Sequence, residues 1–214
     1  MYFYLLLEVR SPTYEHILMT KELTKEVILR VAARAFATYG YNGVSIRDIA
    51  KSVDINHALI RYHFGNKQDL WLSVCSSLLS KVVAMSESCI FNPDASDIDT
   101  EIEKYIKYRV THFAHNPELI KIYTMELIEG GERYQIIEKM VRLHYINYTK
   151  DQLLILQSLG YGVGININDG YFAFPFMFAG RFLHSNFLMD LDGKNLEMEE
   201  VINRQTDLII NFIK

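Results

Sequence analysis

Residues 45–67 concentrate side chains that can contact nucleic acid. Arg61 can donate two hydrogen bonds to the edge of a guanine base, and Ala58 is small enough to lie against a thymine methyl group. His57, Ala58 and Arg61 are spaced so that a helix presents them outward from its first turns. Hydroxyl, imidazole and ammonium groups that can hold phosphate surround these three residues. They belong to Ser45, Tyr62, His63 and Lys67.

Two short helices are predicted to position these side chains. The first spans residues 46–53 with Ser45 as its N-cap, and the second spans residues 57–64 with Asn56 as its N-cap. The side chains that face one another across the break are apolar, which fixes the angle between the helices. Such a pair is a helix-turn-helix if its second helix can lie in the major groove of DNA. The free N–H groups at both helix starts, including the start at Asn56, add anion-binding sites.

The rest of the chain is also predicted to be helical. Apolar residues recur every three to four positions, and no segment alternates convincingly between apolar and polar residues as a strand does. The predicted helices span residues 21–39, 67–85, 97–115, 117–129, 132–158, 170–190 and 196–213.

The predicted fold is therefore all-α, with a three-helix head and a larger helical body. We place the helix-turn-helix head at residues 20–66 and the body at residues 67–214. Residues 1–19 form an N-terminal extension. Two interpretations of it stay open: an over-extended start site, or an additional arm or helix that packs on the body.

Charge is distributed unevenly between these parts. The net charge is −4, yet residues 20–85 hold nine Lys and Arg against five Asp and Glu. Residues 86–214 hold twelve against nineteen. A basic N-terminal third on an acidic body is the pattern expected if only that third contacts phosphate.

Cysteine content and hydropathy exclude two classes of protein. With only Cys75 and Cys89, a secreted domain built on disulfides is not expected. The apolar run at residues 1–7 is far shorter than the roughly 20 residues that span a bilayer, and it lacks the flanks of a signal peptide. We therefore expect a cytoplasmic protein without a membrane partner.

The sequence from residue 45 to residue 71, SIRDIAKSVDINHALIRYHFGNKQDLW, resembles the DNA-binding module of the tetracycline-repressor (TetR) family of bacterial transcription regulators. The preceding AARAFATYGYNGVS is similar to the end of that family's first helix. The close resemblance covers about residues 24–75, and the remainder agrees with the family only in size and helical layout.

The resemblance implies a role for each matching position. Arg47 would reach a base edge from the first helix of the motif, and His57, Ala58 and Arg61 would read bases from the second. Ser45, Tyr62, His63 and Lys67 would hold the DNA backbone. Many family members carry tyrosine at the position of Arg61, so this residue departs from the usual pattern.

The resemblance also implies that the body binds a small-molecule effector and pairs with a second copy. The body is rich in aromatic residues and methionines, most of which are expected to be core, and an aromatic cavity would suit a flat or hydrophobic effector. The candidate pocket residues are Tyr105, Arg109, His112, Phe113, Met125, His144, Tyr145 and Phe176. The two apolar C-terminal helices are expected to form the dimer contact through Phe172, Phe176, Phe187, Ile202, Leu208 and Ile209.

The predicted function is a dimeric regulator, a repressor that a small effector releases from a palindromic operator. One alternative keeps the DNA-binding head but makes the body a docking surface for a protein partner. A helical enzyme or metal-binding protein is the remote alternative, because no phosphate loop, nucleophile elbow or complete metal-ligand set occurs. His112 and His115 share a helix face but lack an evident third ligand, so no metal or other cofactor is expected.

Overall fold

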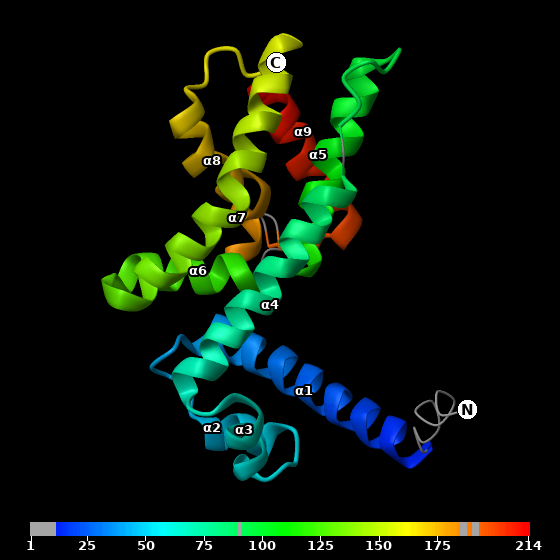
Figure 1. Ribbon diagram of the computed structural model, residues 1–214. Coiled ribbons are helices and arrows are strands. Elements are labelled where there is room, and N and C mark those ends of the chain that lie inside the picture. The colour runs from blue at the N-terminus through cyan, green and yellow to red at the C-terminus, as the bar shows by residue number, and fades with distance from the viewer. Residues whose placement is uncertain (1–11, 90, 185–187, 190–192) are drawn as a thin grey trace, which may run out of the picture. The chain divides into compact units, whose positions relative to one another are not determined.

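The computed structural model describes the backbone of residues 12–89, 91–184, 188–189 and 193–214 (Figure 1). Side chains are described from Thr24 onward within these ranges, except at residues 144–147 and 171–172. The described residues form helices and one isolated antiparallel bridge between Met189 and Asn195. Their contacts divide the chain into two units, Met1–Val74 and Cys75–Lys214.

The first unit contains α1 (Pro12–Tyr39), α2 (Ile46–Ser52), α3 (His57–Phe64) and the first turns of α4 (Lys67–Ser88). Their apolar faces meet in a core whose central side chains are Ile28, Phe36, Ile49, Ile60 and Trp71, each at most 2 % exposed. The helix expected at residues 21–39 is present, but it begins at Pro12 and so includes part of the predicted extension. It ends at Gly40, whose φ of 68° and bond from its N–H to the Phe36 carbonyl (3.0 Å) match the expected glycine C-cap.

The break between α2 and α3 is as short as the sequence predicts. Its second residue, Asp54, is the one described non-glycine residue with a positive φ, 52°. Aspartate tolerates this left-handed conformation better than most residues do. The next residue, Ile55, donates its N–H to the Ala50 carbonyl at 3.0 Å, which ties the turn back to α2. A compact turn therefore holds the two helices of the motif together.

The second unit is a helical body. It comprises the rest of α4, then α5 (Ile98–His115), α6 (Glu118–Glu129), α7 (Gly131–Ser158), α8 (Ile167–Ala179), the 3-10 helix η1 (Gly180–Leu183) and α9 (Met198–Ile213). Helix α5 packs against α8 and α9, and α7 packs against α6 and α8 (Figure 1). The division between the units falls within α4, whereas the sequence placed it at the start of that helix.

One predicted helix is wrong in its extent. Residues 170–190 were expected to form a single helix, but α8 ends at Ala179 and a 3-10 turn follows. Pro175 lies inside α8, where its ring cannot donate the usual backbone hydrogen bond. Pro117 also differs slightly from expectation, because it is the N-cap of α6 and not its first helical residue.

Helix α4 is the one helix, in the part of the chain that the structure describes, with the length and apolar composition to cross a membrane. Half of its most apolar window is buried inside the protein. The core helices of globular proteins have the same length and composition, so α4 is explained by its role in packing.

Candidate functional site

The two helices of the motif are fixed by the caps that the sequence predicts. The Ser45 hydroxyl accepts the Asp48 N–H at 3.1 Å and donates to the Asp48 carboxylate. The Asn56 side-chain oxygen accepts the Ala58 N–H at 2.8 Å. Because these polar groups hold the helix ends, contact between Ser45 and a phosphate requires its hydroxyl to exchange its bond with Asp48.

Helix α3 separates a buried face from an outward face. Ile60 and Phe64 are buried in the core of the first unit, whereas Ala58, Arg61 and Tyr62 are exposed. Tyr62 is 72 % exposed, so its ring and hydroxyl are accessible on this outward face. His57 and His63 are partly exposed at the margins of this face.

Arg47 and Lys67 lie at the starts of the neighbouring helices. Arg47 is the second residue of α2 and is exposed. Lys67 is the first residue of α4, and its ammonium group lies 4.3 Å from the centre of the Tyr41 ring. Asn66 caps α4 by accepting the N–H groups of Gln68 and Asp69 at 2.8 and 3.0 Å. The predicted DNA-contacting residues thus all belong to one small unit and lie on α2, α3, their caps and the start of α4.

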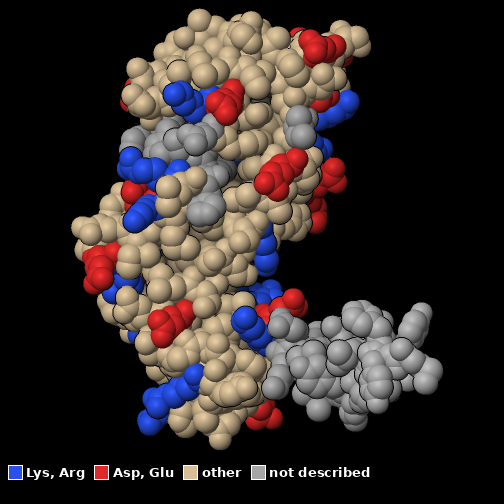
Figure 2. Space-filling model, viewed as in Figure 1, with Lys and Arg blue, Asp and Glu red and all other residues tan. Residues whose placement is uncertain are grey.

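Charge on the body is mixed. In the view of Figure 2, basic and acidic side chains are interspersed over the second unit, with wide uncharged areas between them. A surface of this kind does not set up the field of one sign that attracts nucleic acid. On the face in view, the body therefore presents no patch of one sign that would attract phosphate.

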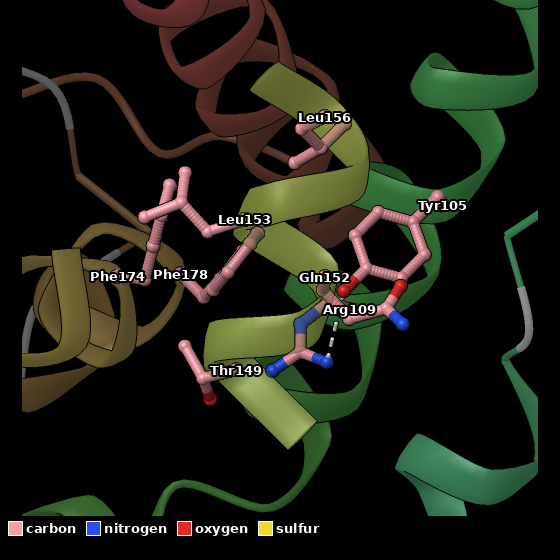
Figure 3. A pocket seen from close by; sticks show the side chains of 8 residues that line it. All are labelled: Tyr105, Arg109, Thr149, Gln152, Leu153, Leu156, Phe174 and Phe178. Atoms are coloured by element: carbon pink, nitrogen blue, oxygen red, sulfur yellow. Dashed lines mark hydrogen bonds between the residues drawn. The ribbon is translucent and has the colours of Figure 1, made fainter. Parts of the chain in front are cut away.

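The body contains a small cavity lined by residues of α5, α7 and α8. Its walls are Tyr105, Arg109, Thr149, Gln152, Leu153, Leu156, Phe174 and Phe178 (Figure 3). Its volume is about 20 Å³, and one water molecule needs about 10–15 Å³. In this conformation the cavity therefore holds little more than a water molecule.

Arg109 is the most unusual wall residue, because its charged side chain is only 1 % exposed. Its guanidinium carbon lies 4.8, 5.5 and 5.6 Å from the ring centres of Phe178, Tyr148 and Tyr105. One guanidinium nitrogen also donates to the Tyr105 hydroxyl at 3.4 Å. Aromatic faces stabilise a buried cation through their negative quadrupole, and burial strengthens that attraction.

Two further polar groups near Arg109 have no hydrogen-bond partner among the described residues. They are the Thr149 hydroxyl, on the cavity wall, and Nε2 of His112, one turn further along α5. The pKa of His112 is lowered from 6.5 by burial first, and then by the positive charges of Arg109 and Lys81. This part of the body is therefore both desolvated and electropositive.

The structure brings together only part of the predicted pocket. Tyr105 and Arg109 line the cavity, whereas His112, Phe113, Met125 and Phe176 are not among its walls. The side chains of His144 and Tyr145 lie outside the described residues. The wall residues that sequence reasoning missed are Thr149, Gln152, Leu153, Leu156, Phe174 and Phe178.

The predicted dimer contacts differ in how exposed they are within the single chain. Ile202 and Ile209 are 4 % and 1 % exposed, because they face the core of their own chain. Leu208 is 62 % exposed on α9, and its neighbour along that face, Phe212, is 63 % exposed. Phe176 is partly buried, while the side chains of Phe172 and Phe187 lie outside the described residues.

Within the described ranges, no group of three or more His, Cys, Asp and Glu side chains is placed to hold a metal ion. Cys75 and Cys89 are both free thiols, and burial raises the pKa of each. A raised pKa keeps a thiol protonated and unreactive at neutral pH.

Comparison with known proteins places these features in context. Residues 28–74 match the sequence model of a family described as bacterial regulatory proteins, tetR family. The chain is similar to the helix-turn-helix transcriptional repressor SCO4008 of Streptomyces coelicolor, with 34 % identity over 110 residues, covering 51 % of this chain and 53 % of the relative. The chain matches about half of the length of this relative, and about half of the length of the repressor NicS of Pseudomonas putida.

Solved structures extend the similarity to both units. HlyIIR, a hemolysin II transcriptional regulator, has a TM-score of 0.61 and 24 % identity, covering 89 % of this chain and 98 % of its own. AibR, solved in complex with isovaleryl coenzyme A and operator DNA, has a TM-score of 0.63 and 18 % identity, covering 87 % of this chain and 97 % of its own. At these identities the likeness shows a common fold: a helix-turn-helix head followed by a helical body.

Proposed function

We propose that this chain is a dimeric, sequence-specific repressor of transcription of the tetR family of bacterial regulatory proteins, whose sequence model matches residues 28–74. The observation that carries the proposal is the outward face of α3, with Ala58, Arg61 and Tyr62 exposed on a helix that two caps and a tight turn hold in place. A helix presented in this way fits the major groove of DNA. The names of the relatives, which are transcription repressors, favour repression and a non-enzymatic role.

Within this proposal, the residues have distinct roles. Arg47, His57, Ala58 and Arg61 contact base edges, and the phosphate contacts come from polar groups around them. Those groups belong to Ser45, Asn56, Tyr62, His63 and Lys67. At Asn56 the contact comes from the helix start that this residue caps, where N–H groups attract anions.

We further propose that a small molecule bound in the body releases the protein from its operator. The cavity between α5, α7 and α8 supports this, as does the fold shared with AibR, a protein solved with both a small ligand and operator DNA. Release requires the ligand to bind the DNA-incompetent state more tightly than the competent one, with a typical coupling of about 1–3 kcal/mol. Dimerisation is proposed to use α8 and α9, with Leu208 and Phe212 as the exposed apolar residues of α9.

The test is selection of bound sequences from a random duplex library by the purified protein. We expect a palindromic motif, because a symmetric dimer reads two equivalent half-sites. Arg47→Ala should lose or relax the motif, since a bidentate contact discriminates against a wrong base by about 1–3 kcal/mol. Arg142→Ala is the matched control, because Arg142 is an exposed arginine on α7 that pairs with Glu138.

The selection is run on protein that has been unfolded and refolded to remove any bound ligand. Recovery of no motif from this material would overturn the DNA-binding proposal. Equal loss of the motif in both variants would show that Arg47 acts through stability and not through base recognition.

A further inference from the structure

The buried charge of Arg109 has a consequence for the chemistry of the effector. A guanidinium carries five N–H donors and stays protonated, so it keeps its positive charge when it is buried. The contacts of Arg109 include three aromatic rings and one tyrosine hydroxyl, and the guanidinium forms part of the cavity wall. An anionic group in that cavity would face a fixed positive charge in a medium of low polarity, where the attraction is strong.

The other cavity walls fit the same kind of ligand. None of the eight wall residues, all of them within the described ranges, is acidic, so no wall side chain would repel an anion. Thr149 is only 6 % exposed, and its buried hydroxyl has no hydrogen-bond partner among the described residues. It can donate a hydrogen bond to an anionic oxygen beside Arg109. The Gln152 amide and the Tyr105 hydroxyl are the other polar groups on the wall.

The remaining walls are apolar. Leu153 and Leu156 come from α7, and the stacked rings of Phe174 and Phe178, with centres 6.0 Å apart, come from α8 (Figure 3). The cavity is therefore polar and positive around Arg109 and hydrophobic elsewhere. Because the cavity holds little more than a water molecule, a ligand must move these side chains apart. Pro175 follows Phe174 in α8 and removes one backbone hydrogen bond from that helix.

We propose that the effector is an organic anion, a carboxylate on a small apolar body, with Arg109 as its counter-ion and the Thr149 hydroxyl as its second hydrogen-bond donor. The inference rests on the proposed function only in treating the bound molecule as the effector. The binding site itself stands on the cavity and its walls. Arginine matches the planar geometry of a carboxylate, which it can bind through two parallel hydrogen bonds.

The experiment measures binding to the full-length protein by titration calorimetry and thermal shift. The probes are aliphatic and aromatic carboxylates of graded size, each paired with its neutral primary amide. We expect some carboxylates to bind at least about tenfold more tightly than their amides, because charge-assisted hydrogen bonds to a buried arginine are lost in the amides. Panel-wide absence of binding, or equal binding of acid and amide, would overturn the proposal and leave the cavity as a site for water only.

Two variants assign the effect to named groups. Arg109→Met keeps an unbranched apolar stem and removes the charge, and it should lower carboxylate affinity by about tenfold to a hundredfold while leaving amide affinity unchanged. Thr149→Val keeps the shape and removes the hydroxyl, and it should lower carboxylate affinity by a smaller factor. Arg142→Met, on the surface of α7, is the control. If Arg109→Met fails to fold, undiminished carboxylate affinity in Thr149→Val would contradict the proposed second donor.

Adding operator DNA separates this inference from the proposed function. Carboxylate binding that depends on Arg109 but leaves operator affinity unchanged supports the anion site and contradicts its role as the effector site. If a carboxylate releases the wild-type protein from the operator but does not release Arg109→Met, the result supports both the anion site and its role as the effector site.

Discussion

His112 shows how one buried side chain links stability to pH. Burial, followed by the charges of Arg109 and Lys81, lowers its pKa below the ordinary value of 6.5. The unfolded chain therefore takes up a proton at a pH where the folded protein resists it. As the pH falls from about 6.5 towards the lowered pKa of the folded state, the protein loses stability, and below that pKa the loss is complete.

We expect His112→Gln to reduce this acid-dependent loss. The free energy of unfolding, measured by urea at about pH 7.5 and about pH 5, should fall less in His112→Gln than in the wild type. His184→Gln is the control, because it alters an exposed histidine of the same unit, and it should keep the wild-type difference. Identical differences in all three proteins would show that His112 is protonated as easily in the folded state as in the unfolded chain.

At the residue scale, the sequence predicts the head better than the body. The exposed positions of α3 follow from helical periodicity and two local caps, which are properties of adjacent residues. In the body, Tyr105 and Arg109 were identified as pocket candidates, but Thr149, Phe174 and Phe178 were not. Their inclusion depends on which faces of α7 and α8 meet α5, and no local pattern determines that contact.

At the scale of the element, Gly65 limits how α3 can end. Its φ of 81° and ψ of −111° lie in a backbone region that residues other than glycine rarely adopt. A Cβ atom added there would also lie 2.8 Å from a carboxylate oxygen of Asp69, and that carboxylate accepts the Asn66 N–H. The glycine thus allows the chain to pass directly from the cap of α3 to the cap of α4.

Gly65→Ala should therefore destabilise the first unit by about 1–3 kcal/mol. The single tryptophan of the chain, Trp71, is fully buried in that unit, so its fluorescence reports unfolding of the head. Gly164→Ala is the matched control, because an added Cβ meets open space there and Gly164 has no positive φ. A Gly65→Ala variant with the wild-type denaturation midpoint would refute the argument from backbone strain.

Element boundaries were predicted where the determinants are local. Helices α2 and α3 lie within one residue of their predicted bounds, because Ser45, Asn56 and Gly65 act on adjacent backbone groups. Helix α8 was predicted too long, since its continuous apolar run conceals the effects of Pro175 and of the 3-10 turn at Gly180. Apolar composition predicts that this segment is buried, but it does not fix where the helix ends.

At the scale of the whole molecule, assembly is the feature that the single chain constrains least. The sequence predicted an apolar C-terminal contact, yet two of its named residues, Ile202 and Ile209, are used by the chain's own core. Helical periodicity marks both residues as apolar but does not distinguish a face buried within the chain from one buried by a partner. Leu208 and Phe212 remain exposed and are available to a second copy.

A symmetric dimer predicts that operator binding depends on the spacing of the half-sites. The recognition helices of such a dimer meet half-sites about one DNA turn apart or a multiple of it. Inserting about 5 base pairs at the centre of the selected operator turns one half-site to the opposite face of the duplex. We expect affinity, measured by fluorescence anisotropy at fixed salt, to fall by about a hundredfold or more, because linked binding of the second head is lost. An inserted operator bound as tightly as the original would mean that the heads bind independently, and the two-fold arrangement proposed for α8 and α9 would then be wrong.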